Sequence, residues 1–161
     1  MRCVLPKEQS SRRLLFEQLE DRRLLASDMI ALVITHGQQI FPSSDKPEND
    51  WQGAIATAVK NEIEEWYSLA KHAYLSPDST PKIEPIYPEW NTYGAISPAE
   101  LRKVASRIEE VANQAGGPID LVLVGHSRGT IFNDRLAREM KNLLPSLPDK
   151  LDNIYGIHLD P

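Results

Sequence analysis

The segment LVLVGHSRGT, residues 121–130, constrains the fold more than any other part of the sequence. It is an apolar run of strand length that passes, through Gly-His-Ser-Arg-Gly, into a segment whose apolar residues recur at helical spacing. Short apolar runs of this kind are typical of strands that are buried on both faces, as in parallel sheets covered by helices. The segment therefore predicts a strand, a tight turn and a helix of an α/β fold.

The same alternation of strands and helices runs through the rest of the chain. Strands are predicted at 29–37, 82–88, 119–125 and 153–161, and helices at 51–74, 97–117 and 127–144. Pro85 cannot donate a ladder hydrogen bond, so the second strand is expected at a sheet edge. Because crossovers between parallel strands are right-handed, this order predicts a three-layer sandwich with helices on both faces of a mainly parallel sheet.

Two of the predicted helices carry further signals. The second has Ser97 as N-cap, Pro98 in the first helical position and Glu100 completing a capping box, and Gly116-Gly117 stops it. In the third, apolar spacing indicates that four side chains point inward: Ile131, Leu136, Met140 and Leu143.

Composition limits the function classes. The net charge is -5, and no basic face follows residue 28, which argues against nucleic acid or an anionic membrane surface as a partner. The longest apolar runs are far below the ~18 to 20 residues of a membrane span. Cys3 is the only cysteine, so no internal disulfide is expected.

Residues 1–28 differ from the body, residues 29–161, in being rich in arginine and poor in candidate core residues. They lack the apolar stretch of a secretory signal, and their leucines also fit a short amphipathic tail. The segment FEQLEDRRLLAS, 16–27, resembles the LEPR-XLL motif of large bacterial proteins, with Asp21 in place of its usual proline. The resemblance implies a targeting tag outside the fold, and hence export or a cell-surface location; without it, a cytoplasmic location is expected.

The pattern Gly125-His126-Ser127-Arg128-Gly129 indicates a serine nucleophile. A strand that turns sharply into a helix has no room for side chains on either side of the serine, which accounts for the glycines. The hydroxyl would stand at the helix N-terminus, where the dipole favours a developing negative charge. The alternative is a strand-to-helix turn without chemistry.

Two other predicted strands end at the same edge of a parallel sheet. His36-Gly37 ends the first, so the backbone N–H groups of Gln38 and Arg128 are candidates for an oxyanion hole. Asp160 ends the last strand and is a candidate to orient a catalytic histidine. The alternatives are that His36 and Gly37 only cap and turn the strand, and that Asp160 belongs to a solvated Asp-Pro turn.

Together, the short segments THG, GHSRG and LDP resemble the α/β-hydrolase family, and the last resembles its lipase branch. The resemblance covers roughly residues 29–161 and implies a four-stranded sheet in the order 2-1-3-4. It implies Ser127 as nucleophile, Gln38 and Arg128 as oxyanion donors and Asp160 as the acid, with support from the turn residues His36, Gly37, Gly125, His126 and Gly129. The implied substrate is a small-molecule or lipid ester, and no cofactor is needed.

The catalytic base is missing from this set. The family order is serine, acid, histidine, so the histidine should follow Asp160, yet only Pro161 does. None of the four histidines replaces it, since His36 belongs to the oxyanion loop, His72 to a helix, His126 to the turn and His158 to strand packing. We therefore expect a histidine from a missing C-terminal part or from a partner chain. The alternative is a catalytically silent fragment that keeps the binding face of the fold.

Three smaller expectations concern the same edge. A metal site of His36, His126, His158 and Asp160 is a third functional class, although no ligand spacing supports it. Arg128 would meet an anionic substrate group or form an ion pair with Asp134 or another helix carboxylate. Trp51 and Trp66 lie on the apolar stripe of the first helix, whereas Trp90 and Tyr93 are expected to be freer to touch a ligand.

Overall fold

The computed structural model describes residues 28–37, 51–71 and 80–159. The strands are β1 (Met29–Thr35), β2 (Lys82–Ile86), β3 (Ile119–His126) and β4 (Leu151–Leu159), and the helices are α1 (Trp51–Lys71), α2 (Pro98–Gln114) and α3 (Arg128–Leu143), with a short 3-10 turn at Pro148–Lys150. The tail, Gln38, His72 and Asp160 lie outside the described residues.

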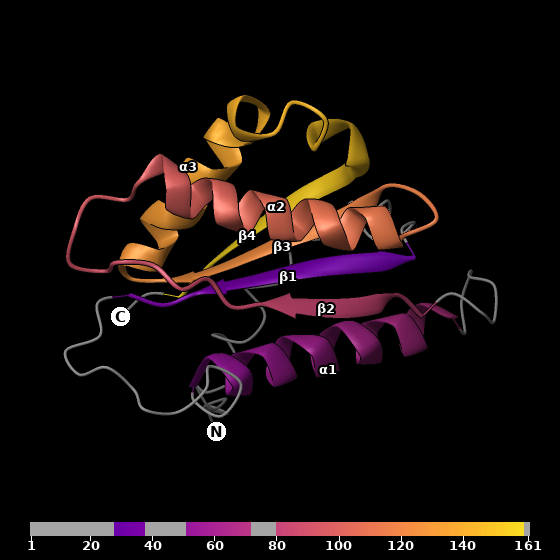
Figure 1. Ribbon diagram of the computed structural model, residues 1–161. Coiled ribbons are helices and arrows are strands. Elements are labelled where there is room, and N and C mark those ends of the chain that lie inside the picture. The colour runs from indigo at the N-terminus through magenta and orange to yellow at the C-terminus, as the bar shows by residue number, and fades with distance from the viewer. Residues whose placement is uncertain (1–27, 38–50, 72–79, 160–161) are drawn as a thin grey trace, which may run out of the picture.

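The four strands form one parallel sheet in the order β2-β1-β3-β4. Helix α1 covers one face, and α2 and α3 cover the other (Figure 1). The predicted three-layer α/β sandwich and its strand order are therefore confirmed. Pro85 lies in the edge strand β2, as the missing donor requires.

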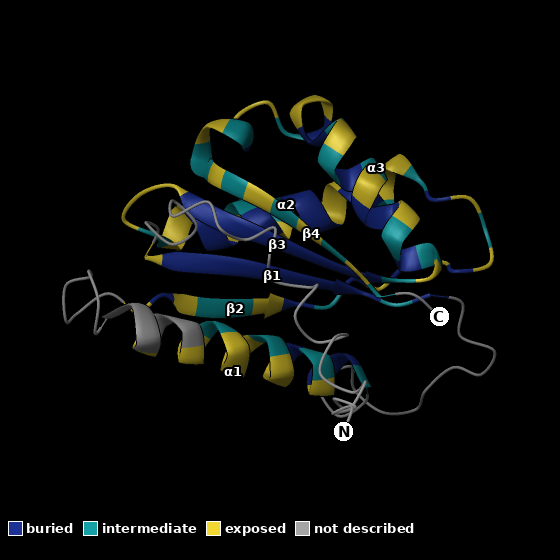
Figure 2. Ribbon diagram, turned by 180° about the vertical axis from the view of Figure 1, so that it is seen from behind, coloured by how far each residue is buried: buried dark blue, intermediate teal, exposed yellow. Residues whose placement is uncertain are grey.

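Strands β1 and β3 form the centre of the molecule and are buried along almost their whole length (Figure 2). Their side chains alternate between two cores. Ala31, Val33, Leu121 and Leu123 pack on the side of α2 and α3. The opposite side chains of both strands pack toward α1, against Ala56 and its neighbours. Burial on both faces explains why these segments are continuous apolar runs.

Helix α2 begins as its sequence predicts. The Ser97 hydroxyl accepts a hydrogen bond from the backbone N–H of Glu100 at 3.2 Å, and the Glu100 carboxylate accepts one from the backbone N–H of Ser97 at 2.8 Å. Each interaction satisfies an N–H group that the first helical turn leaves without a partner. The helix ends at Gln114, just before the two glycines.

Two expectations about side-chain orientation are wrong. Ile131 does not point inward but is 60% exposed, because the core position belongs to its neighbour Phe132. His158 does not project into packing either, since its side chain is 54% exposed. The reason is that β4 is an edge strand on which every second residue is exposed, and the same face leaves Ile154 46% exposed.

Candidate functional site at the end of strand β3

Ser127 lies at the junction of β3 and α3 with φ 53° and ψ −123°, and it is the only non-glycine residue with positive φ in the described part of the chain. This conformation is rare for a residue with a side chain and persists only where the surrounding structure imposes it. Ser127 is exposed, and its hydroxyl makes no capping hydrogen bond although it is the N-cap of α3. The hydroxyl is therefore presented at the helix N-terminus and is not used to stabilise the helix.

The flanking glycines are required by the backbone around the turn. A Cβ atom on Gly125 would lie 2.7 Å from the backbone nitrogen of Thr130. A Cβ atom on Gly129 would overlap the carbonyl oxygen of Thr35 and lie 2.9 Å from that of His36. The spacing of glycines in the sequence thus has the steric cause that was predicted for it.

Thr35, at the end of β1, joins this turn to the sheet. Its side chain is fully buried, and Oγ1 lies 3.0 Å from the carbonyl oxygen of Gly129 and 3.2 Å from that of Val124, as a donor to both. Carbonyl groups at the start of α3 and near the end of β3 are thus held by one hydroxyl. Sequence analysis missed this contact.

The structure brings His36 and Gly37 beside Ser127. A Cβ atom on Gly37 would lie 2.7 Å from Cβ and 3.2 Å from Oγ of Ser127. The parallel pairing of Thr35 with Gly125 produces this contact, because it places the ends of β1 and β3 side by side. Arg128, whose backbone N–H is the other predicted oxyanion donor, begins α3.

The three described histidines have different neighbours. The His36 ring lies 6.1 Å from the Trp90 ring, and its Nδ1 is 2.7 Å from the carbonyl oxygen of Gly37. His126 contacts the ring of Trp51 in α1 at 5.5 Å, edge to face. His158 Nε2 lies 3.9 Å from the Asp134 carboxylate.

No hydrogen bond from a histidine to the Ser127 hydroxyl is found among residues 28–37, 51–71 and 80–159. Those residues also include no group of three His, Cys, Asp or Glu side chains placed to hold a metal ion. The residues proposed for the third, metal-binding class are therefore not brought together in the part of the chain that is described.

Arg128 binds the loop before α2 and forms no ion pair with Asp134. Its guanidinium donates to the carbonyl oxygen of Thr92 and, at 2.6 Å, to that of Gly94, and it lies 5.9 Å from the centre of the Trp90 ring. Asp134 lies instead within 3.9 Å of Arg138 and His158. The expected ion pair with Asp134 is replaced by this contact with backbone carbonyls.

Further hydrogen bonds hold the same loop. Arg135 donates to the carbonyl oxygen of Ile96 at 2.6 Å. The Asn91 side chain accepts from the N–H groups of Tyr93 at 3.0 Å and Gly94 at 3.2 Å, and the backbone N–H of Asn91 donates to Glu100 at 2.7 Å. Hydrogen bonds from Asn91 and Ser97 lower the pKa of Glu100, because they stabilise its ionised form.

The two aromatic residues of this loop differ in exposure. Trp90, expected to be free for a ligand, is buried against Phe132, with 5.0 Å between the ring centres. Tyr93 is 60% exposed, as predicted.

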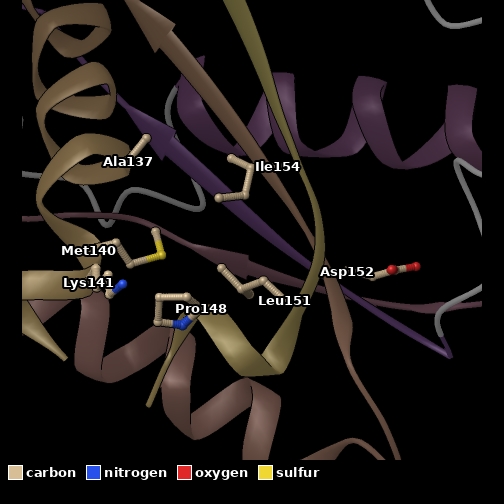
Figure 3. A pocket seen from close by; sticks show the side chains of 7 residues that line it. All are labelled: Ala137, Met140, Lys141, Pro148, Leu151, Asp152 and Ile154. Atoms are coloured by element: carbon tan, nitrogen blue, oxygen red, sulfur yellow. The ribbon is translucent and has the colours of Figure 1, made fainter. Parts of the chain in front are cut away.

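A hollow of about 250 Å³ lies elsewhere, between α3 and the first half of β4 (Figure 3). Met140, Leu151 and Ile154 line it, together with Ala137, Lys141, Pro148 and Asp152. The side chain of Asp152 points away from the others. None of the predicted site residues lines this hollow.

Comparison with protein families finds one match, of residues 10–29, to a family described as Planctomycete extracellular. The matched residues include the whole of the segment that resembles a targeting motif, and they stop at the first residue of β1. Comparisons with curated proteins and with solved structures find no match. No helix within 51–71 or 80–159 combines the length and the apolar character that crossing a bilayer requires.

Proposed function

We propose that this chain is a serine hydrolase of carboxylic esters or related acyl bonds, with Ser127 as its nucleophile. The observation that carries the proposal is the conformation of Ser127, an exposed serine at positive φ between two glycines that admit no side chain. Strained backbone of this kind gathers at active sites, and a strand-to-helix turn without chemistry has no need of it at a serine.

In this mechanism the Ser127 hydroxyl attacks the carbonyl carbon of the ester while its proton passes to a base. The negative charge then develops on the former carbonyl oxygen. We assign its stabilisation to the backbone N–H groups of Arg128 and Gln38, together with the N-terminal end of α3. The alcohol leaves, and water releases the acid from the acyl-enzyme.

The proposal assigns the base to a histidine in a further part of the protein or in a partner chain, oriented by Asp160. Support comes from the neighbours of His36, His126 and His158, whose rings contact Trp90, Trp51 and Asp134. The alternative, a catalytically silent fragment with a binding face, predicts a Ser127 without unusual reactivity.

A fluorophosphonate probe tests the proposal, because it reacts with activated serines. We expect the protein to be labelled when it is tested together with the further part or partner chain that supplies the histidine, and its Ser127→Ala variant not to be. Ser146→Ala is the matched control, since Ser146 is exposed and its hydroxyl donates to Glu109 at 2.7 Å. Mass spectrometry of the labelled peptide locates the modified residue. Absence of label under those conditions, or label at another serine, would refute the proposal and favour the silent fragment.

We further propose that the chain acts outside the cytoplasm, on the basis that residues 10–29 match a family described as extracellular. Fractionation of cells that produce the chain with and without residues 10–29 tests this. Retention of both forms in the cytoplasm would contradict it.

A further inference from the structure

The two edges of the sheet differ in how they are protected against pairing with another strand. β2 is short, contains Pro85, and carries charged side chains. All three features block the addition of a strand. β4 is longer and has no proline, and within the described residues its outer side pairs with no strand. Its one charged residue, Asp152, lies at its irregular start. The rest of β4, from Asn153 to Leu159, is therefore an open edge without carboxylate, lysine or arginine.

Both faces of this edge carry apolar side chains. Tyr155 and Ile157 continue the core on the α1 side, where they pack against its buried residues but are only half-buried themselves. Ile154 lies on the opposite face, where it lines the hollow beside α3 and is 46% exposed. A long apolar strand edge with unpaired backbone groups is a template for a further strand.

Gly156 lies in the middle of this segment, and the chain itself does not require a glycine there. Its φ is not positive, and a Cβ atom would meet only Nε2 of His158, at an ordinary 3.7 Å. Glycine inside a strand weakens the strand, and it often marks a place where another backbone approaches closely. No such approach to Gly156 is made within the described residues.

We propose that β4 pairs with β4 of a second copy of this chain, antiparallel, about a two-fold axis through Gly156. In a two-fold contact each residue meets its counterpart reciprocally, so the strand must be complementary to itself. About this axis, Tyr155 of each copy lies opposite Ile157 of the other, and Ile154 lies opposite His158. An aromatic residue opposite a β-branched one is among the pairs that stabilise antiparallel strands, and here the pair forms twice.

The neighbouring registers are less complementary. An axis through Tyr155 would set the apolar Ile157 opposite the polar Asn153. An axis through Ile157 would leave Ile154 without a counterpart between Leu151 and Leu159. The absence of carboxylate, lysine and arginine after Asp152 also suits a second copy, because like charges on identical strands would otherwise meet.

The contact is independent of the proposed function. The carboxyl ends of antiparallel strands point in opposite directions, so the Ser127 turns of the two copies lie at opposite ends of the joint sheet. Each copy keeps its own site, and the contact does not supply the catalytic histidine. Loss of the dimer and loss of serine reactivity are thus separate results.

The first test measures the mass of the purified full chain by sedimentation equilibrium over a range of concentrations. We expect a dimer, and we expect Ile154→Lys to weaken it about a hundredfold, by a factor of about ten for each of the two copies. Ile131→Lys is the matched control, because Ile131 is an exposed isoleucine on α3 and should leave the dimer intact. Circular dichroism checks that both variants are folded. A chain that is monomeric throughout, or a dimer that Ile154→Lys leaves unchanged, would overturn the proposal.

The second test measures the register. A two-fold axis through Gly156 sets this residue opposite itself, with about 4.5 to 5.5 Å between the Cα atoms, which is within the reach of a disulfide. Cys3 is first removed by Cys3→Ser, since it is the only cysteine of the chain. In that background we expect Gly156→Cys to form a covalent dimer on oxidation. Ile154→Cys should not, because the two copies of residue 154 would lie about 13 Å apart. Failure of Gly156→Cys to cross-link, or equal cross-linking of both variants, would overturn the pairing.

Discussion

Gly37 lies directly against Ser127, so that a Cβ atom at position 37 would come within 2.7 Å of the serine Cβ. The two residues are far apart in the sequence, and the parallel pairing of β1 with β3 brings them together. Backbone, not a side chain, thus faces the hydroxyl on this side.

Substitution of Gly37 tests this contact. We expect Gly37→Ala to slow fluorophosphonate labelling at least tenfold, because the added methyl group displaces either the loop or the serine. Overpacking of this kind costs about 1 to 3 kcal/mol of stability. Gly117→Ala is the control, since a Cβ atom there meets nothing within 4 Å. Normal labelling of Gly37→Ala would contradict the assigned geometry.

The positive φ of Ser127 predicts an unusual stabilising substitution. Glycine adopts this conformation without the steric penalty that Ser127 bears, so we expect Ser127→Gly to raise the free energy of unfolding by about 1 kcal/mol relative to Ser127→Ala. Urea denaturation of the two variants measures the difference. Equal stability of both would mean that the turn is not strained.

Thr35 provides a test of the contact between β1 and α3. Thr35→Val removes the hydroxyl that donates to the carbonyl groups of Gly129 and Val124, and with it this buried hydrogen bonding. We expect a loss of about 0.5 to 1.5 kcal/mol. Thr35→Ser keeps the hydroxyl and should lose less. A Thr35→Val variant as stable as the original chain would show that this hydroxyl contributes nothing to the junction.

Glu100 predicts a dependence of stability on pH. Its pKa in the folded chain is lowered from 4.5 by the N–H groups of Asn91 and Ser97. The stability that it contributes is therefore fully present above pH 4.5 and is lost as the pH falls through the lowered pKa. Glu100→Gln should flatten the acid part of a plot of urea midpoint against pH. Glu89→Gln, at a side chain that is 79% exposed, should not.

The fold could be predicted because its signals are local. The apolar runs of β1 and β3 and the capping box at Ser97 each identify an element without knowledge of its neighbours. Apolar spacing does not tell which side of α3 faces the core, because Ile131 and Phe132 are adjacent and only one of them enters it. Strand alternation likewise divides β4 into two faces, but does not tell which face is left uncovered at an edge.

The site was predictable at Ser127 and less so around it. Two glycines at fixed spacing indicate the tight turn. The contacts of Arg128 could not be predicted, because its partners are backbone carbonyl groups, which have no signature in the sequence. The bond from Thr35 to Gly129 joins residues 94 positions apart and follows only from the pairing of strands. Contacts of this kind depend on the finished fold and not on local pattern.

Because β1 pairs with β3, the reactivity of the Ser127 hydroxyl indicates whether these distant segments have folded together. Its neighbours come from the end of β1 and the start of α3, so its surroundings form only when distant segments have docked. Contacts of such long sequence separation form late, after local helical structure. During gradual denaturation, the reactivity of this one hydroxyl should therefore vanish together with the sheet, while α2, held by its own capping box, keeps part of its circular dichroism.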